Sequence, residues 1–442
     1  MSVAALETEA LSEDEQHLVR KLRASVGARL AEHVTEGTAA AERKRIGSEL
    51  IDDALMAHAR AALAGGGRGV LNNLAEAKVA RAVFDALFGM GGLQRWLDDP
   101  LVENITANGF DHVFVQYADG TKVQVGPIAA SEEDFVELLR TIAARAGTEE
   151  RRFDRAHPQL NIQLPDGSRL FAVMGVSDRV SMTVRRHRHM AVSLQQLTTM
   201  GMFDFDIAAQ LAATVRAKLN ILVSGPMGGG KTTMARALAG CIGPEERLVT
   251  IEDTYELGLG KTHPDVVALQ AREDNVEGHG AITQAELVRM SLRMNASRVI
   301  VGEVRGEELV PMLNAMMMGT DGSIGTIHAS SSKQAFDKMA TYAIQSPERL
   351  DRSATNLLVG SALHVVVQLA RLRDGTRVVS SIREITGVGD NGEITSNEVH
   401  KPGRDGRAVP GTGWTADTAQ RLIDAGLDEA VLTRSARAGW SL

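Results

Sequence analysis

The sequence predicts an α/β fold, in which a C-terminal domain with a parallel sheet follows a small α+β domain and an N-terminal helical region. Apolar residues recur at helical spacing before about residue 95, and short β-branched runs flank turns between residues 102 and 184. After Leu219, apolar strand patterns alternate with helical ones. Such alternation is typical of a parallel sheet covered by helices.

The composition is that of a folded protein, because 44% of the 442 residues are apolar and 24% are charged. The net charge of −8 and the aromatic content of 4% argue against a nucleic-acid-binding protein. A single cysteine, Cys241, excludes an intramolecular disulfide and favours a reducing compartment. Met1–Arg20 holds five acidic residues against one basic residue, and no apolar run approaches the roughly 20 residues of a spanning helix. We therefore expect a cytoplasmic protein that is at most peripherally attached to a membrane.

The N-terminal region, residues 1–95, is predicted to be helical. Ser12 and Glu15 have the spacing of a capping box at the start of a periodic apolar run. Two further helices are expected around Ile46–Leu63 and Val70–Phe88. Because this region carries no catalytic pattern, we interpret it as a small bundle for docking or oligomerisation.

The second region, residues 96–190, is predicted to be a small α+β domain that ends in a linker over residues 191–200. A turn at Ala118–Gly120 between two β-branched runs indicates a hairpin. The predicted elements are two hairpin strands, a helix, two strands around a turn and a last strand: Val113–Tyr117, Thr121–Val125, Ser131–Ala146, the residues flanking Pro165–Ser168, and Ser181–Val184.

The third region, residues 201–372, is predicted to hold the parallel sheet. Its expected strands are Asn220–Ser224, Arg247–Ile251, Val266–Gln270, Arg298–Val301 and Gly322–His328. Residues 373–442 are rich in Gly, Asp and Asn, and we expect one hairpin and a last helix at Asp417–Ala425 there. No role is assigned to this tail.

A glycine-rich loop in the third region carries the clearest signal of chemistry. Gly225–Thr232 reads G-P-M-G-G-G-K-T between an apolar run and a predicted helix. Glycines allow backbone N–H groups to surround phosphate oxygens, and the helix N-terminus adds partial positive charge. Lys231 is expected to reach the β and γ phosphates, and the Thr232 hydroxyl to ligate Mg²⁺. The predicted nucleotide-binding residues are Gly225, Met227, Gly228, Gly229, Gly230, Lys231, Thr232 and Thr233.

An apolar strand with an acid at its tip is the second predicted part of the site. Arg298–Glu303 reads R-V-I-V-G-E, and Gly302 stands where an aspartate is common. A nucleotide site needs an acid on such a strand for its metal ion. We therefore assign Thr232 and Glu303 to Mg²⁺, with Glu303 acting through water.

Three more acids follow the predicted strand Arg247–Ile251. Ligands of parallel sheets bind at the carboxyl ends of the strands, so Glu252, Asp253 and Glu256 are expected to face the phosphates. Glu252 is our candidate for the base that activates water, and Asp253 and Glu256 are the alternatives. His328 ends another strand and is expected to contact the γ-phosphate.

These motifs, in this order and spacing, resemble the secretion ATPase superfamily of type II and type IV secretion systems and type IV pili. The matching segments, named in that family the Walker A, Asp box, Walker B and His box motifs, are residues 225–233, 250–257, 292–308, and 318–323 with 326–330. Asp98–Gly109 and Leu164–Arg169 are similar to the family's N-terminal domain. The resemblance covers about residues 95–372 and is closest to the CpaF (TadA-type) ATPases of tight-adherence pili.

The resemblance implies a P-loop RecA-like domain behind a PAS-like α+β domain, in a homohexameric ring that hydrolyses ATP with Mg²⁺ where the two domains meet. It also implies a place at the inner face of the cytoplasmic membrane, where inner-membrane pilus or secretion platform proteins are the partners, and no nucleic acid. In the family, arginines of the N-terminal domain contact the phosphates. Carried over by motif, these are Arg169 and Arg185, with Arg186 as an alternative because the doublet leaves the register open.

Two other functions fit a P-loop core. A nucleic-acid translocase is disfavoured by the net charge of −8. A nucleotide-gated scaffold that barely hydrolyses is disfavoured by the intact pair Glu252 and Glu303. The sequence departs from the family's pattern at Thr320, Ser330 and Asn295–Ala296, which leaves the phosphate chemistry intact and the pilus subfamily open.

Overall fold

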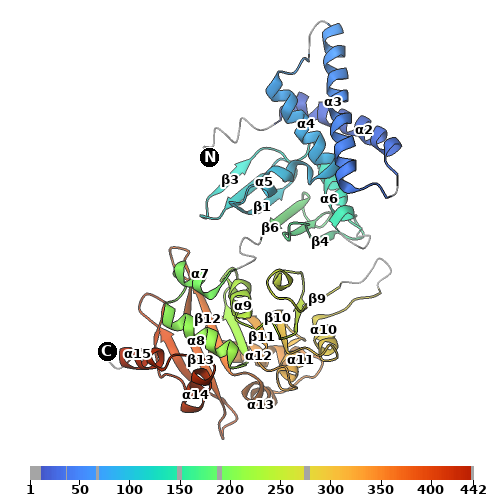
Figure 1. Ribbon diagram of the computed structural model, residues 1–442. Helices are drawn as coiled ribbons and strands as arrows, with labels where there is room; N and C mark the ends of the chain where they lie inside the picture. Colours follow the sequence, from blue (N-terminus) through green and yellow to red (C-terminus); the bar gives the residue numbers. More distant parts are fainter. Residues whose placement is uncertain are drawn as a thin grey trace. The chain divides into compact units, whose positions relative to one another are not determined.

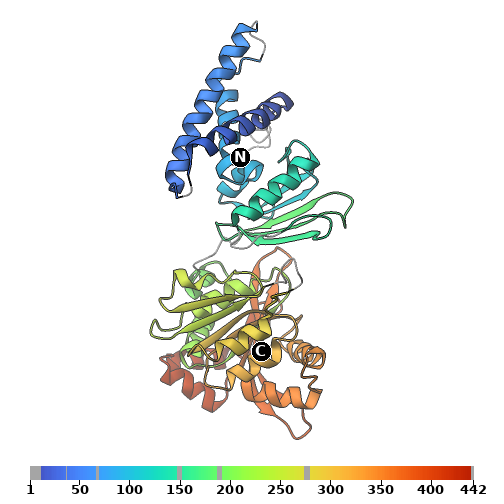
Figure 2. The same ribbon diagram turned by 90° about the vertical axis from the view of Figure 1, so that its right-hand side faces the viewer.

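The computed structural model describes residues 11–35, 37–65, 69–146, 152–186, 192–272 and 279–439. The chain forms two compact units, Met1–Arg188 and His189–Leu442, coloured from blue to teal and from green to red in Figures 1 and 2. The predicted fold class is confirmed: an α/β unit with a P-loop follows an α+β domain and a helical region. Within the described ranges, no helix is both long and apolar enough to cross a membrane.

Helices open the first unit. They are α2 (Glu13–His33), α3 (Ala40–Ala64), α4 (Asn73–Phe88), the 3₁₀ turn η1 (Gly91–Leu93) and α5 (Gln94–Asp98). The predicted capping box at the start of α2 is confirmed, because the Ser12 hydroxyl accepts from the Glu15 N–H while the Glu15 carboxylate accepts from the Ser12 N–H. Val26, Val79 and Val83 are fully buried where α2 and α4 pack together with α3. A continuous apolar stripe on each helix therefore builds this small core.

An antiparallel sheet completes the first unit, in the order β3-β2-β1-β6-β5-β4. Its elements are β1 (Val102–Asn108), β2 (Val113–Tyr117), β3 (Lys122–Val125), α6 (Glu132–Ala146), β4 (Gln159–Gln163), β5 (Arg169–Val173) and β6 (Ser181–Arg185). Helix α6 lies against one face of the sheet, where its buried side chains Phe135, Leu139 and Ile142 join the core (Figure 2). The strands alternate buried and accessible residues, as expected when only one face of a sheet is covered.

The second unit is built on one sheet of nine strands, in the order β15-β14-β13-β12-β7-β11-β10-β8-β9. Its strands are β7 (Ile221–Gly225), β8 (Leu248–Glu252), β9 (Val266–Gln270), β10 (Arg298–Val304), β11 (Ile324–His328), β12 (Val365–Arg371), β13 (Arg377–Val388), β14 (Ile394–Pro402) and β15 (Ala408–Pro410). The strands from β12 to β9 run parallel, and β13, β14 and β15 add antiparallel strands beyond β12. Because β7, β11, β10 and β8 are neighbours, their carboxyl ends meet at one edge.

Helices cover both faces of this sheet (Figure 1). They are α7 (Leu194–Thr199), α8 (Phe205–Arg216), α9 (Lys231–Ala239), the 3₁₀ turn η2 (Leu259–Lys261), α10 (Gln284–Ser291), α11 (Leu309–Met316), α12 (Gln334–Gln345), α13 (Arg352–Ala362), α14 (Ala416–Asp424) and α15 (Glu429–Gly439). Two separate apolar cores, one on each face, are divided by the strands. The P-loop strand β7 therefore lies in the interior of the sheet.

The second unit extends beyond the predicted bounds of residues 201–372 on both sides. The segment predicted as a linker, residues 191–200, contains helix α7, whose Leu194 and Leu197 are buried in the core of the second unit. The chain after Leu372 does form the predicted hairpin and helix, but β13–β15 extend the same sheet instead of forming a separate tail. His400 and Trp414 both hydrogen-bond Gln210 of α8, so this part packs back onto the start of the unit.

Candidate nucleotide-binding site

The glycine-rich loop joins β7 to α9 at the carboxyl edge of the sheet. Helix α9 begins at Lys231 after Gly230, which has a left-handed φ of 91°, and Gly228 has a φ of 68°. A Cβ at Gly225 would lie 3.0 Å from the Leu369 Cβ, so the strand end approaches β12 closely. These positions favour glycine, because a left-handed φ or a close backbone approach strains a residue that has a Cβ, and loops of this kind can surround an anion with backbone N–H groups. The loop is therefore shaped as an anion-binding nest.

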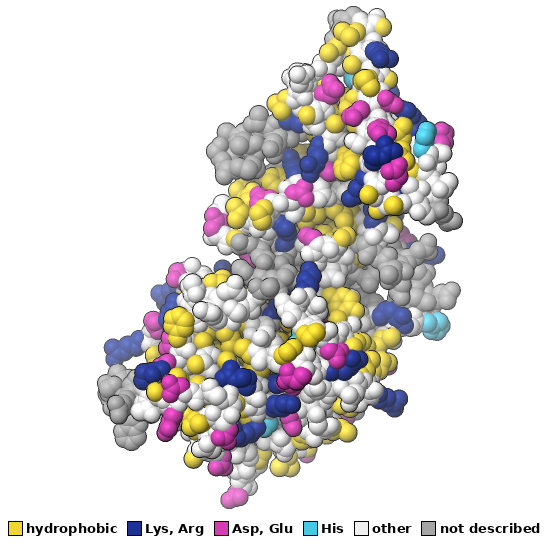
Figure 3. Space-filling view, viewed as in Figure 1, with side chains coloured by type: hydrophobic (Ala, Val, Ile, Leu, Met, Phe, Trp, Pro, Cys, Tyr) yellow, Lys and Arg dark blue, Asp and Glu magenta, His cyan; other side chains and the backbone are white. Residues whose placement is uncertain are grey.

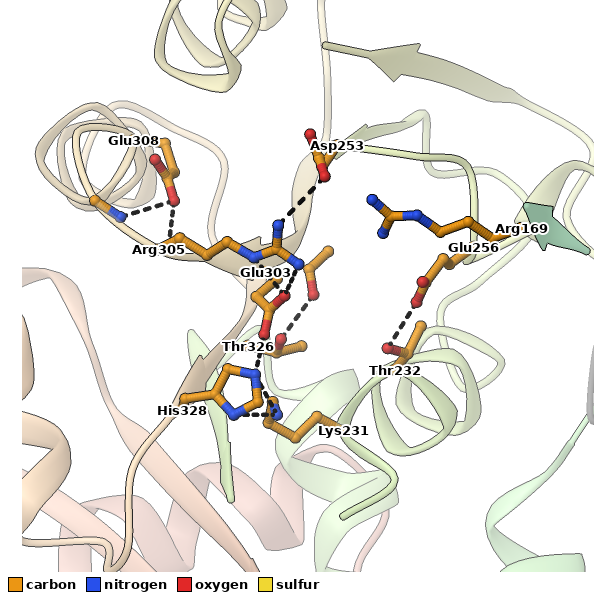
Figure 4. Close-up of polar contacts among 12 residues, drawn as sticks. Arg169, Lys231, Thr232, Asp253, Glu256, Glu303, Arg305, Glu308, Thr326 and His328 are labelled. Atoms are coloured by element: carbon orange, nitrogen blue, oxygen red, sulfur yellow. Dashed lines mark hydrogen bonds and ion pairs between the residues drawn. The ribbon is translucent and has the colours of Figure 1, made fainter. Parts of the chain in front are cut away.

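Lys231 lies at the bottom of this nest. Its side chain is buried, and its Nζ donates to the Pro226 carbonyl at 3.2 Å. The same Nζ lies 3.0 Å from His328 Nδ1 and 3.3 Å from His328 Nε2 (Figure 4). Burial and the Lys231 ammonium lower the pKa of His328, so the ring is held neutral beside the lysine. The histidine reaches this place because β11 pairs with β7 in a register that sets His328 opposite Gly225.

Glu303 lies on the other side of His328. The His328 Nε2 pairs with one Glu303 carboxylate oxygen, and Arg305 Nε donates to the other oxygen at 2.7 Å. Arg305 Nη1 also donates to Asp253 at 3.2 Å. A continuous chain of polar contacts thus runs from Lys231 to Asp253 and joins the ends of β7, β11, β10 and β8 (Figure 4).

The Glu252 carboxylate, which we expected to face the phosphates, is buried and accepts hydrogen bonds from its own turn. The Glu252 side chain is only 3% exposed, and its Oε2 accepts the backbone N–H groups of Glu256 and Leu257, both at 2.7 Å. Burial raises the pKa of Glu252 to about 7, although these two hydrogen bonds act in the opposite direction. A Cβ at Gly302 would lie 3.1 Å from the Glu252 Cγ, which explains the glycine at that position. Glu252 therefore organises the turn that follows β8.

Glu256 is the acid that the turn presents to the P-loop. The Thr232 hydroxyl donates to Glu256 Oε2 at 3.3 Å (Figure 4). The buried Arg236 of α9 donates to the backbone carbonyls of Glu256 and Leu257, the latter at 3.0 Å. Glu252 thus accepts from the N–H groups of Glu256 and Leu257, and Arg236 donates to the carbonyls of the same two residues. We call this arrangement the clamp. It fixes the backbone from which the Glu256 side chain reaches Thr232.

The donor set fits a magnesium nucleotide. Among the described residues, no cluster of three His, Cys, Asp or Glu side chains could hold a metal ion. Mg²⁺ in phosphate-transfer sites is held by one or two protein oxygens together with phosphates and water. The Thr232 hydroxyl and the Glu256 carboxylate supply oxygens of this kind at 3.3 Å from one another.

The two arginines predicted from the first unit are neighbours on its sheet. Arg169 begins β5, Arg185 ends β6, and the two residues are direct cross-strand partners. Arg169 Nε donates to Asn161 at 3.2 Å, and the Arg185 side chain is exposed. Arg186 is instead partly buried, and its guanidinium donates to the carbonyls of Asp99 and Val102. This difference favours Arg185 over Arg186 as the residue available to a ligand.

Sequence reasoning gave Arg305 no defined place in the site and did not consider Arg236. Residues two apart in an extended chain point to the same side, so Arg305 could have been placed beside Glu303 from spacing alone. Arg236 has no comparable signal, because its partners are backbone carbonyls of a turn that sequence patterns do not locate.

A scan against protein-family models matches residues 89–438 to the type II/IV secretion system protein family, which is most of the chain. The chain belongs to this family. The predicted secretion-system ATPase is thereby confirmed at the level of the family. The finer prediction of a CpaF-type pilus protein is not distinguished by this match.

Individual relatives agree with the family assignment. A Mycobacterium tuberculosis protein, provisionally named conjugal transfer protein Rv3659c, is 35% identical over 311 residues, which cover 68% of this chain and 86% of the relative. Protein VirB11 of Agrobacterium fabrum is 32% identical over 304 residues, covering 62% and 86% of the two chains. The solved VirB11 ATPase of the Brucella suis type IV secretion system, in complex with sulphate, is 26% identical with a TM-score of 0.36, and the match covers 67% of this chain and 97% of that one. The assignment rests on the sequence matches.

Proposed function

We propose that this family member is a motor that hydrolyses ATP with Mg²⁺ to drive pilus assembly or protein secretion. The observation that carries the proposal is the clamp formed by Glu252 and Arg236, which aims a carboxylate at the P-loop threonine. A P-loop that served only to bind phosphate would not need a second acid fixed from both sides. The arrangement is that of a site built to move a proton beside a phosphate.

Glu256 is assigned as the acid that accepts the proton of the attacking water. The Glu252 carboxylate accepts hydrogen bonds from two backbone N–H groups, and Glu303 is paired with His328 and Arg305. Glu256, by contrast, contacts the side chain that P-loops use at the metal. We therefore assign the role of general base to Glu256 instead of Glu252.

The other groups divide the remaining work. The loop N–H groups and Lys231 hold the β and γ phosphates, and Lys231 offsets charge that develops at the γ-phosphate. His328, neutral and 3.0 Å from the Lys231 Nζ, orients the ammonium and links it to Glu303. Thr232 would hold Mg²⁺ with Glu256 nearby and Glu303 acting through water; the ion supplies charge neutralisation when bound.

Arg169 and Arg185 complete the cationic complement in our proposal. Lys231 and one Mg²⁺ leave the charge of a triphosphate incompletely balanced in the transition state. Two arginines side by side at the ends of β5 and β6 match the arginines that the family's N-terminal domain brings to the phosphates.

The assembly and its partners are the remaining parts of the proposal. We infer a homohexamer that works at an inner-membrane platform, on the cytoplasmic face, and assign it to the CpaF (TadA-type) branch on the spelling of the motifs at residues 225–233, 250–257 and 292–308. Basic and acidic side chains are interspersed on the face of the described residues seen in Figure 3, which supports a protein partner over nucleic acid.

The test is ATP turnover by the purified chain. We expect Mg²⁺-dependent phosphate release that EDTA abolishes and that single-stranded or duplex DNA leaves unchanged. Release that requires nucleic acid would support a translocase instead. Tight ATP binding without release by an assembled ring would support a nucleotide-gated scaffold.

A further inference from the structure

The hairpin of β12 and β13 lies beside the P-loop. Strand β12 runs parallel to β7 and pairs with it, so both strands end at the edge where the loop begins. The chain then turns back through residues 372–376, where the Leu372 N–H donates to the Thr376 carbonyl at 2.8 Å, and β13 starts at Arg377. The hairpin tip is therefore a neighbour of the loop, although about 150 residues separate them in the chain.

Arg377 contacts the loop directly. Its Nε donates to the carbonyl oxygen of Gly228 at 2.9 Å. A Cβ at Gly230 would lie 3.4 Å from the Arg377 Cδ, so the arginine stem passes across the last glycine before α9. The guanidinium and the stem together contact the two glycines of the loop that have a left-handed φ.

The peptide between Gly228 and Gly229 is consequently held at both ends. Arg377 holds its carbonyl, and the Gly229 N–H donates to the Pro226 carbonyl at 3.1 Å. The same Pro226 oxygen accepts from Lys231 Nζ at 3.2 Å. The orientation of this one peptide is thus coupled to the position of the lysine.

Peptide orientation decides whether such a loop binds anions. A peptide is planar, so its N–H and C=O groups point in opposite directions and turn together. Glycine adopts φ of either sign with little cost, so a run of glycines can rotate a peptide and aim a carbonyl oxygen at the phosphate. A carbonyl in the nest would repel the anion that the N–H groups attract.

We propose that Arg377 is a positioning residue for the P-loop, which keeps the Gly228 carbonyl turned away from the phosphates. The inference rests on the proposed function, because it concerns the same nucleotide. It gives a role to a part of the chain after Leu372 for which the sequence suggested none. The role belongs to the β-phosphate end of the nucleotide, and it requires no contact between Arg377 and the base.

The experiment measures the affinity of the full-length chain for ADP and for inorganic pyrophosphate by calorimetry. Arg377→Ala is expected to weaken both about tenfold, the effect of losing one charge-assisted hydrogen bond in the loop. Arg377→Lys retains a donor and should recover part of the loss. Arg373→Ala removes the same charge from the same turn, so it controls for the electric field of the hairpin and should bind both ligands as the wild type does.

The outcomes separate the inference from the proposed function. If the wild-type chain binds neither ligand, the proposed function fails. If it binds both and Arg377→Ala binds them equally well, the positioning role is overturned. A loss for ADP without a loss for pyrophosphate would place Arg377 at the base or ribose and would also overturn it. Melting temperatures without ligand check that each variant is folded; a folded Arg377→Gln serves if the alanine variant is not.

Discussion

The two sheets of this protein carry their candidate functional side chains in different places. In the second unit, β7 and β8 are buried at every residue, and the candidate site residues lie at or just beyond their carboxyl ends. In the first unit, β5 and β6 alternate in burial, and Arg169 and Arg185 stand on the accessible side of the sheet. Strand ends of a parallel sheet converge by topology, so their side chains have fixed partners.

Arg169 and Arg185 lie directly opposite one another on antiparallel strands, and like charges in such a position destabilise a sheet. Their cost would be offset by an anion that binds between them. The cluster at the strand ends is held by contacts within the chain, whereas the cationic pair on the accessible face would be stabilised further by a bound anion. The experiments below test whether the two sets differ in this way, starting from the largest expected effect.

Lys231→Ala is expected to lower ATP turnover about 10⁴-fold, because it removes the buried cation aimed at the phosphates. Phosphate release by the purified variant is the measurement. His328 loses its lysine partner at the same time, so Lys231→Met, which fills the same space, is the matched control for packing. Turnover near the wild-type rate in both variants would remove the P-loop from the mechanism.

Arg169→Ala is expected to lower turnover about 10³-fold and to weaken ATP binding only modestly, since an arginine that acts in the transition state contributes little to ground-state affinity. The melting temperature without nucleotide should stay level or rise, because one of two facing cations is gone. Arg185→Ala should behave in the same way as Arg169→Ala.

Arg186→Ala is the matched control. Loss of the hydrogen bonds from Arg186 to the Asp99 and Val102 carbonyls should lower the melting temperature. Unchanged turnover in both Arg169→Ala and Arg185→Ala would make them ordinary surface residues.

The two glutamates of the turn after β8 should separate in function. Glu256→Gln is expected to bind ATP normally and to lose about 10²-fold in turnover, because an amide cannot accept the proton of water. Glu252→Gln keeps an oxygen for the N–H groups of Glu256 and Leu257, so it should stay within about tenfold of the wild type. The reverse ranking, measured under single-turnover conditions, would return the base to Glu252.

The last expected effect is on stability, with no change in turnover, and it depends on pH. Burial raises the pKa of Glu252 to about 7 from 4.5, so between these values the folded chain holds a proton that the unfolded chain has lost. Stability contributed by this proton should therefore fall as the pH rises from about 4.5 to 7, by on the order of 3 kcal/mol, and stay level above.

The comparison of wild type with Glu252→Gln isolates this effect. His400, whose pKa burial lowers to about 4, acts in the opposite direction, because its neutral folded form gains stability as the pH rises. Urea unfolding at pH 5 and pH 7.5 gives the free energies. An equal change in both proteins would show that Glu252 ionises in the folded state as it does in the unfolded one.

Much of the second unit could be predicted because its signals are local. The sequence motif at Gly225–Thr232 locates the loop, and the apolar runs that end in Glu303 or His328 locate the ends of two strands. The order of these strands then brings the tips together without knowledge of any side-chain contact. Lys231, His328 and Glu303 accordingly lie in one chain of contacts.

The orientations of the Glu252 and Glu256 side chains could not be predicted, because they depend on the direction of a turn. Both residues follow the same strand, and only the hydrogen bonds to the 256–257 backbone decide which carboxylate points to Thr232. The extension of the sheet by β13–β15 was missed for a related reason. Strands β13–β15 are separated by glycine-rich turns, and their residues contact segments far away in the sequence. His400, for example, hydrogen-bonds Gln210, which lies 190 residues earlier.

The strand order also has a consequence for how the chain folds during synthesis. Strand β7 lies between β11 and β12, which are made roughly 100 and 150 residues after it. At about 5–20 residues per second, the P-loop strand waits on the order of 10 s with both edges unpaired. The hydrogen bond between Asp206 and Arg434 joins residues 228 positions apart in the chain. Long-range pairing of this kind folds slowly and exposes strand edges, so we expect the nascent chain to need chaperone protection at least until β11 and β12 have been made.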